Sequence, residues 1–409
     1  MKMKGIKGGL CAVKGVRAHG IKEGNNGLAL VEGKGIAIGM FTSNKIKAAP
    51  VRFTEKLLEE GEGRISAIIA NSGCANSFTG EKGIRNAEKM AELASSSLGV
   101  DKEEVVVAST GPIGKQVDME LIERQIGKVV QGLTSDEKGS MRAAKAIMTT
   151  DTFHKERAIS INAGDDERVV IGGITKGSGM IFPHLGLATM LAFIYTDAPL
   201  GKEVLRRSLE DAVDDSFNMV VVDGDMSTND MVLLVSTGQG GKVREEDFKE
   251  GLNFVCKELA KLIARDGEGA TKFIEVRVRG TASAGDAREI AKAIVRSPLV
   301  KSAIFGERPD LTCGRIIATI GSSSIYGDVD QKGIAISLKS GDKEGEGKVQ
   351  GKVLVVNKGE FMDFSGVVRD IMKGKEILID VDIGRGKEEV SATAWGCDLS
   401  YDYVRINAG

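Results

Sequence analysis

The sequence is poor in the residues that most often build metal centres and histidine-based catalytic sites. Its 409 residues include only three histidines and five cysteines. The cysteines are odd in number, widely scattered and never spaced as CxxC, which argues against a disulfide framework and against a zinc site. We therefore expect no metal and no histidine triad, and we interpret the histidines as structural or surface residues.

Blocks of one charge and long apolar runs are also missing. The 56 lysines and arginines nearly balance the 58 aspartates and glutamates, for a net charge of −2. Without a basic cluster, a nucleic-acid partner is not expected. No apolar run approaches the length that spans a bilayer, and the N-terminal lysines lack the apolar stretch of a signal peptide. These absences predict a soluble cytoplasmic protein with no membrane partner.

Patterns of strands and helices alternate along the whole chain. Apolar and β-branched runs predict strands, among them 65–70, 104–108, 168–174, 190–195, 231–236, 273–279 and 315–320. Helical spacing of apolar residues predicts helices near 83–98, 118–133, 138–148, 202–217, 245–265 and 285–296. Such mixing predicts a layered α/β or α+β architecture.

Thr189 is a candidate nucleophile. It follows Ala188, between a glycine-rich turn at 176–179 and an apolar run that begins at Met190. A threonine hydroxyl is weakly nucleophilic unless a base takes its proton, and the free α-amine of an N-terminal threonine is such a base. The pKa of an α-amine, about 7.7–8.0, is close to the working range of a cell. A cut between Ala188 and Thr189 would therefore create a nucleophile with its own base.

Other polar motifs allow a functional and a structural interpretation. Thr110 and Gly111 end an apolar run, where a hydroxyl and a backbone N–H suit an oxyanion hole, although the pattern also fits a strand-to-helix turn. The oxygen-rich stretch 222–230 lacks the register of a calcium loop and is interpreted as a tight turn, with a supporting role in an active site left open. Glu268 by itself is a solvated loop acid.

Eight motifs in order resemble one family. They are NSGCAN at 71–76, STG at 109–111, TTDT at 149–152, KGSGMI at 176–181, ATML at 188–191, VDGD at 222–225, EGAT at 268–271 and AWGCDL at 394–399. Together they resemble the glutamate N-acetyltransferases (ornithine acetyltransferases) of arginine biosynthesis, nearly end to end. The wider superfamily includes self-cleaving aminopeptidases. The resemblance implies an αββα-type sandwich with a smaller C-terminal α/β region.

The resemblance also implies a reaction. The chain would cut itself between Ala188 and Thr189 into an α chain, 1–188, and a β chain, 189–409, which fold together and assemble as α2β2. Thr189 would accept the acetyl group of N2-acetylornithine as an ester and pass it to glutamate. No cofactor is implied, although acetyl-CoA is a possible second donor.

Particular residues match the family's site. Thr110 and Gly111 match its oxyanion hole, Lys176 would bind a substrate carboxylate, and Glu268 would face the substrate. Thr150 or Thr152 would line the pocket, and Asn407 matches a substrate-binding asparagine. Charge supports this arrangement, because a lysine suits a carboxylate and a glutamate suits an amino group.

The sequence departs from the family pattern in three places. The loop at 182–187 is about two residues longer than usual, and Cys74 stands where asparagine is usual. The chain also ends at Gly409, short of a terminal threonine that contacts substrate in the family. We expect the longer loop to affect cleavage or the shape of the pocket and the missing threonine to affect the C-terminal part of the pocket, whereas Cys74 is expected to matter little.

Two other functions remain open from the sequence. The first is a self-cleaving aminopeptidase or amidohydrolase, in which water replaces glutamate as the acceptor. The second is an uncleaved amino-acid-binding protein. If the acetyl group is released as acetate whether or not glutamate is present, the first function is favoured over acetyl transfer to glutamate. An intact chain after purification would favour the second.

Overall fold

The computed structural model describes residues 2–164, 167–182, 190–325, 329–341, 352–363, 366–385 and 390–409. The chain divides into two compact units. Unit 1 comprises Met1–Asn218 and Asp225–Ile263, and unit 2 comprises Met219–Gly224 and Ala264–Gly409. Within the described ranges, none of the helices combines the length and the apolar character that a membrane crossing requires.

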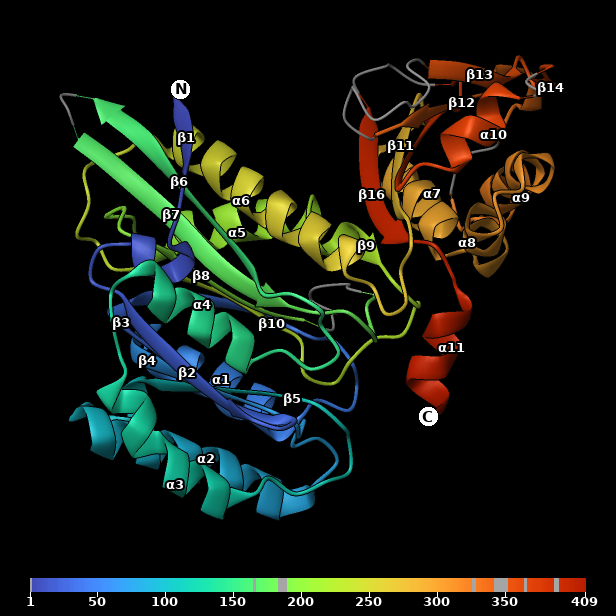
Figure 1. The fold of residues 1–409 in the computed structure, drawn as a ribbon. Coiled ribbons are helices and arrows are strands. Elements are labelled where there is room, and N and C mark those ends of the chain that lie inside the picture. The colour runs from blue at the N-terminus through green and yellow to red at the C-terminus, as the bar shows by residue number, and fades with distance from the viewer. Residues whose placement is uncertain are drawn as a thin grey trace. The chain divides into compact units, whose positions relative to one another are not determined.

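Unit 1 contains one nine-stranded sheet covered by helices (Figure 1). Its strands are β1 (Met3–Ile6), β2 (Arg17–Glu23), β3 (Asn26–Phe41), β4 (Arg64–Ser72), β5 (Val105–Thr110), β6 (Lys155–Gly164), β7 (Glu167–Lys176), β8 (Leu191–Thr196) and β10 (Met231–Ser236). The order is β1-β6-β7-β8-β10-β3-β4-β5, and β2 pairs with β3. Its helices are α1 (Ala49–Glu60), α2 (Gly80–Leu98), α3 (Met119–Gln131), α4 (Glu137–Ala146), α5 (Lys202–Asp214) and α6 (Glu245–Arg265).

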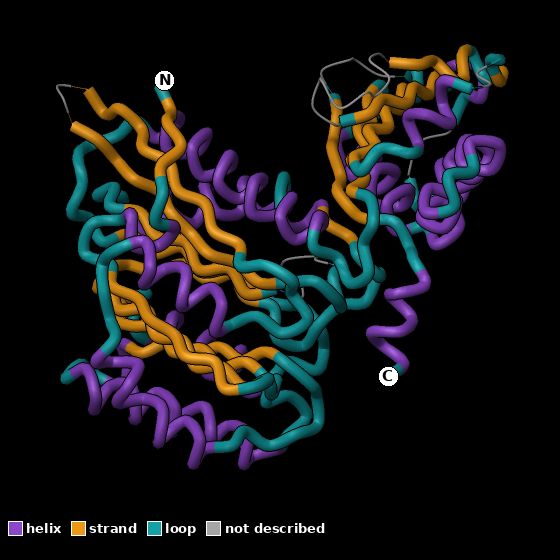
Figure 2. Tube along the Cα trace, in the orientation of Figure 1, coloured by secondary structure: helices purple, strands orange, loops and turns teal. Residues whose placement is uncertain are grey.

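The long strand β3 joins two halves of this sheet. Its first half pairs with β2 and β4, and its second half pairs with β10, with a shift of register between Glu32 and Gly35. Side chains from both halves, among them Val31, Ile68 and Leu233, share one buried cluster. The two halves therefore lie face to face as the inner layers of the unit, as Figure 2 shows.

Successive side chains of each strand point to opposite faces of the sheet, so every strand contributes to the inner layer and to the contact with the outer helices. In β4, Ile68 faces the inner cluster, whereas Ile69 faces a second cluster with Met90 of α2 and Ile122 of α3. On the other side α6 packs closely on β6 and β7. The packing is so close that a Cβ added at Gly251 would lie only 2.5 Å from Ile161 Cδ1. The αββα layering predicted from the resemblance is thus confirmed.

Unit 2 is the smaller α/β region. Its seven-stranded sheet has the order β14-β13-β12-β15-β11-β16-β9. The strands are β9 (Val220–Val221), β11 (Phe273–Arg279), β12 (Ala335–Ser340), β13 (Lys352–Asn357), β14 (Glu360–Phe361), β15 (Glu376–Asp382) and β16 (Ser391–Cys397). The helices are α7 (Ala284–Arg296), α8 (Pro298–Phe305), α9 (Pro309–Ser322), α10 (Val367–Met372) and α11 (Tyr401–Ala408), and α7 packs on β11 and β16.

One strand prediction was wrong, and four of the described helices were missed, namely α1, α8, α10 and α11. The apolar run 315–320, predicted as a strand, lies inside α9, where Ile316 and Ile320 are buried on one face at helical spacing. Helix α1 was missed because Pro50 breaks the apparent pattern, although proline is tolerated in the first turn, where it stands.

Candidate active site

The predicted site residues of unit 1 lie at strand ends and in the loops that follow them. Thr110 is the last residue of β5, and Lys176 is the last residue of β7. Thr150 and Thr152 lie in the loop between α4 and β6 and are exposed. The predicted residues therefore lie at or beyond the ends of strands whose residues are mostly buried.

The predicted cut falls between two paired strands. Ala188 and Thr189 lie outside the described residues. The strands on either side, β7 and β8, pair antiparallel over six residue pairs, which places Lys176 opposite Leu191. A break at this junction would leave β7 in one product and β8 in the other, still paired in one sheet.

The turn after β5 requires glycine. Gly111 has a φ of +137°, and an added Cβ would lie 2.5 Å from Cys74 N and 2.6 Å from the carbonyl carbon of Gly73. The Cys74 amide donates a hydrogen bond to the carbonyl of Thr110 at 3.1 Å. This close backbone contact fixes the orientation of the Thr110–Gly111 pair before any substrate binds, as an oxyanion hole requires.

Two buried asparagines hold this turn. The Asn229 side-chain amide donates to the carbonyls of Ala75 at 2.6 Å and Ser109 at 2.9 Å. The Asn71 amide donates to the carbonyl of Cys74 at 3.0 Å and its oxygen accepts from the Ser109 hydroxyl at 2.6 Å. The loops after β4 and β5 are therefore fixed to each other and to the start of β10.

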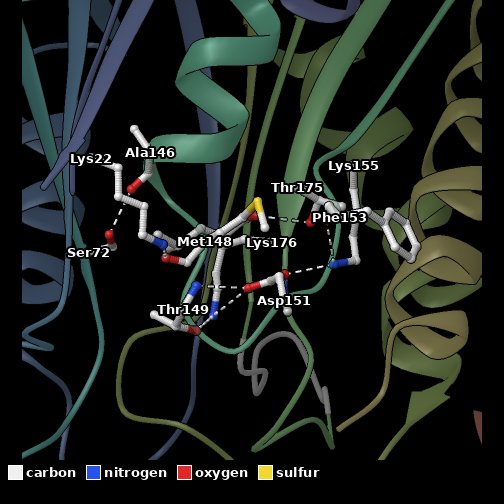
Figure 3. A network of polar contacts seen from close by, with 12 residues as sticks. Lys22, Ser72, Ala146, Met148, Thr149, Asp151, Phe153, Lys155, Thr175 and Lys176 are labelled. Carbon is white, nitrogen blue, oxygen red and sulfur yellow. Dashed lines mark hydrogen bonds and ion pairs between the residues drawn. The ribbon is translucent and has the colours of Figure 1, made fainter. Parts of the chain in front are cut away.

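A buried ion cluster lies beside the end of β7 (Figure 3). The Lys155 ammonium donates to the Asp151 carboxylate at 2.7 Å, and both side chains are fully buried. Lys176 lies 3.9 Å from the other oxygen of Asp151 and donates to the Thr149 hydroxyl at 2.8 Å. The amides of Thr149 and Gly177 also donate to this carboxylate, at 3.0 and 2.8 Å.

Two lysines determine the pKa of the carboxyl group in this cluster. Burial by itself would raise the pKa of Asp151, but the fields of Lys176 and Lys155 and the hydrogen bonds outweigh burial and hold that pKa well below its usual range. One carboxylate thus faces two lysines.

The loop that carries this cluster is tied to neighbouring strands. The Ser72 hydroxyl, at the end of β4, donates to the carbonyl of Ala146 at 2.7 Å. The Lys22 ammonium donates to the carbonyl of Met148 at 2.5 Å. Since Ser72 pairs with Thr110 across β4 and β5, the Thr110–Gly111 turn and the lysine cluster lie at the same edge of the sheet.

The remaining two predicted residues meet in unit 2. The Asn407 amide donates to the Glu268 carboxylate at 2.7 Å. Glu268 is held by a turn at Gly269, whose φ is +68° and whose carbonyl accepts from the Ser400 hydroxyl at 2.5 Å. The structure thus brings together two residues 139 positions apart, and their substrate roles stay predictions.

Two polar residues of the site were missed from sequence. Asp151 stood inside the motif at 149–152, where attention went to the threonines, yet it is Asp151 that joins both lysines. Asn229 lay in the stretch interpreted as a turn, with a supporting role in an active site left open, and its contacts hold the turn after β5. A sequence signal existed only for Asp151, an acid four residues before Lys155.

Comparison with known proteins identifies the family. The model of the ArgJ family matches residues 13–409. The chain belongs to the ArgJ family. It is 49% identical to the glutamate N-acetyltransferase of Methanosarcina mazei, over 99% of both chains. It is 43% identical to the arginine biosynthesis bifunctional protein ArgJ of Caldanaerobacter subterraneus, over 95% of this chain and 94% of that one.

A solved ArgJ structure is also similar. The crystal structure of ArgJ from Bacillus halodurans is 38% identical, covers 52% of this chain and 96% of its own, and has a TM-score of 0.46. As a member of the ArgJ family, the chain is an enzyme, an acyltransferase of arginine biosynthesis. The predicted resemblance and the predicted enzyme class are confirmed, and a simple amino-acid-binding protein is not supported.

Proposed function

We propose that this ArgJ chain moves an acetyl group from N2-acetyl-L-ornithine to L-glutamate through an ester on Thr189. The observation that carries the proposal is the shared sheet edge at which the Thr110–Gly111 turn, Lys176 and Met190 lie. Met190 is the first described residue after the predicted cut. A hydroxyl, a rigid amide turn and a buried cation at one edge are the groups that acyl transfer from an amino acid needs.

The first half of the reaction forms the ester. The free α-amine takes the proton of the Thr189 hydroxyl while its oxygen attacks the acetyl carbon. The negative oxygen that develops is stabilised by the Thr110 hydroxyl and the Gly111 N–H. The carbon–nitrogen bond then breaks, the ornithine amine takes the proton from the α-ammonium, and ornithine leaves. Lys176 binds the substrate carboxylate throughout.

The second half reverses these steps with glutamate. Its amine attacks the ester, the acetyl group moves to nitrogen, and Thr189 regains its proton. Both substrates carry an α-carboxylate for one lysine, which fits an exchange at a single site. The acetyl group travels on the protein, so the proposal includes no metal and no cofactor.

Self-cleavage precedes this cycle in the proposal. A cut between Ala188 and Thr189 leaves β7 in one product and β8 in the other, and their paired backbones hold the products together. The proposed assembly of such pairs is α2β2.

The distribution of the acetyl group tests the proposal. With labelled acetylornithine and glutamate, we expect labelled N-acetylglutamate in amounts that match the ornithine released. Labelled acetate at a rate independent of glutamate would instead establish a hydrolase, the alternative left open by the sequence. The same assay with acetyl-CoA as the donor tests the second reaction.

The Thr110→Ala variant tests the oxyanion hole. Loss of one donor of this kind costs roughly 2.7–4 kcal/mol of transition-state stabilisation, so turnover is expected to fall about 10²–10³-fold. Ser95→Ala is the matched control, because it removes a hydroxyl that binds the Val100 carbonyl at the end of α2. Unchanged turnover in Thr110→Ala would reject this role.

A further inference from the structure

Lys155 is a lysine whose side chain has no access to solvent. It is 0% exposed and stands at the start of β6, opposite Thr175 of β7. Its ammonium lies 2.7 Å from Asp151 Oδ1, 3.4 Å from the Phe153 carbonyl oxygen and 4.9 Å from the centre of the Phe153 ring. Replacing a buried ion pair by apolar side chains of similar volume is often neutral or stabilising. Stability by itself therefore does not explain why a lysine stands here.

The two oxygens of Asp151 have different partners (Figure 3). Oδ1 accepts from the Lys155 ammonium at 2.7 Å and from the Gly177 amide at 2.8 Å. Oδ2 accepts from the Thr149 amide at 3.0 Å and lies 3.9 Å from the Lys176 ammonium. The contact of Asp151 with Lys155 is thus a direct hydrogen bond, whereas the contact with Lys176 is longer than a hydrogen bond.

A neutral hydroxyl group holds the ammonium of Lys176. This ammonium donates to the Thr149 hydroxyl at 2.8 Å. A lysine that is bonded directly to a buried carboxylate has to give up that bond before it can bind a second carboxylate, and such bonds are strong away from water. The longer contact lets Asp151 attract Lys176 without binding it directly. Lys22 also acts on both of these charged groups through its field.

We propose that Lys155 is a positioning residue for Lys176 and acts on it through Asp151. The proposal rests on the proposed role of Lys176 in binding the substrate carboxylate. Lys155 fixes one oxygen of Asp151 and shares its negative charge. Without Lys155, the carboxylate attracts Lys176 more strongly. The Lys176 ammonium is then expected to leave the Thr149 hydroxyl and to form a direct ion pair with Asp151, and the α-carboxylate of either substrate has to compete with that pair.

The Lys155→Met variant is the main test. Methionine is unbranched and suits a buried site, and Asp151 keeps the amides of Thr149 and Gly177, so this variant is expected to fold. We expect KM for acetylornithine and for glutamate to rise roughly 10-fold while kcat changes less than about twofold, because binding weakens and the chemistry does not. Initial rates on protein in the same cleavage state as the wild type measure both constants. A merely structural role would lower kcat through inactive protein and leave KM unchanged.

Removal of the carboxylate charge should reverse the effect on KM. In the Lys155→Met/Asp151→Asn double variant, position 151 no longer carries a charge that draws Lys176 away from the substrate. We therefore expect KM to fall back from the value of Lys155→Met toward that of the wild type. If the two residues only supported the fold, the second substitution would add to the damage of the first. A double variant whose KM is as high as that of Lys155→Met would overturn the proposal.

Lys47→Met is the matched control. Lys47 also lies 2.7 Å from a carboxylate, that of Glu55 on α1, and it is not a member of the cluster around Asp151. We expect its KM values to match those of the wild type. Wild-type KM values in Lys155→Met would refute the positioning role. The proposed function would still stand in that case, because the distribution of labelled acetyl groups in the wild type tests it separately.

Thr149→Val tests the same displacement of Lys176 without a change in the buried pair. Valine has the shape of threonine without the hydroxyl, and Thr149 is only partly buried, so this variant is expected to fold even if Lys155→Met does not. Loss of the hydroxyl partner should let Lys176 move to Asp151 and raise KM roughly 3- to 10-fold. Thr149→Ser keeps the hydroxyl and should keep the wild-type KM. An unchanged KM in Thr149→Val would contradict the proposal, since the position of Lys176 would then not control binding.

Discussion

The Thr189→Ala variant is expected to remain one intact chain of 409 residues and to transfer no acetyl group. Both self-cleavage and ester formation use the same hydroxyl, so one substitution removes both. In a serine protease, loss of the nucleophile lowers kcat by roughly 10⁶-fold, and an effect of that size is expected here. Intact-mass measurement and the acetyl-transfer assay together check the result.

Thr189→Ser is the conservative control for this prediction. Serine retains the hydroxyl and, after the cut, the α-amine, so cleavage into chains of 1–188 and 189–409 and measurable transfer are both expected. Normal activity in Thr189→Ala would remove Thr189 from the mechanism. So would a mature, active enzyme whose mass shows an unbroken junction.

The Asp151→Ala variant is expected to lose about 3–5 kcal/mol of unfolding free energy, the usual cost of removing one partner of a buried ion pair. It would remove the carboxylate that both Lys155 and Lys176 contact. Chemical denaturation of the uncut Thr189→Ala chain, with and without this substitution, measures the effect. Asp151→Asn is expected to lose less, because its oxygen still accepts from the Thr149 and Gly177 amides.

An exposed ion pair is the matched control for Asp151. Asp310 pairs with Arg308, and both side chains are more than half exposed. Solvent screens such pairs, so Asp310→Ala is expected to cost less than about 1 kcal/mol. Equal losses in the two variants would show that the buried cluster does not hold the fold.

The stability that Asp151 contributes depends on pH. Lys176 and Lys155 hold the native pKa of Asp151 below its unfolded value of about 3.9. Its stabilisation is therefore fully present above that pH and is lost as the pH falls toward the native pKa. Asp151→Asn should flatten the acid limb of the stability curve.

Local patterns predicted much of the fold. The apolar stripe at 83–98 became α2, and the stripe at 245–265 became α6, because a helix with one buried face repeats its apolar residues at a fixed spacing. The run 315–320 was misread because a short apolar segment satisfies both a strand and a buried helix. Only the packing of α9 on α7 and α8 decided between them.

The candidate site, like the fold, was predicted from the sequence only where its features are local. The motifs placed Thr110, Gly111 and Lys176 correctly at strand ends, since glycine turns and polar residues after apolar runs are local features. They gave no sign that Asn229 binds the turn after β5, 120 residues earlier in the chain, or that Asp230 lies beside Met190. Those relations depend on the order of strands in the sheet, which no local spacing encodes.

The sequence by itself determined the family, the layered class of fold and the chemical types at the site. It did so because motif order, apolar periodicity and turn residues are properties of neighbouring positions. Tertiary structure alone decided which buried charges meet and why the pKa of Asp151 is lowered despite its burial. The pKa of a carboxyl group depends on the charges and the solvent around it, and only the folded chain brings these together.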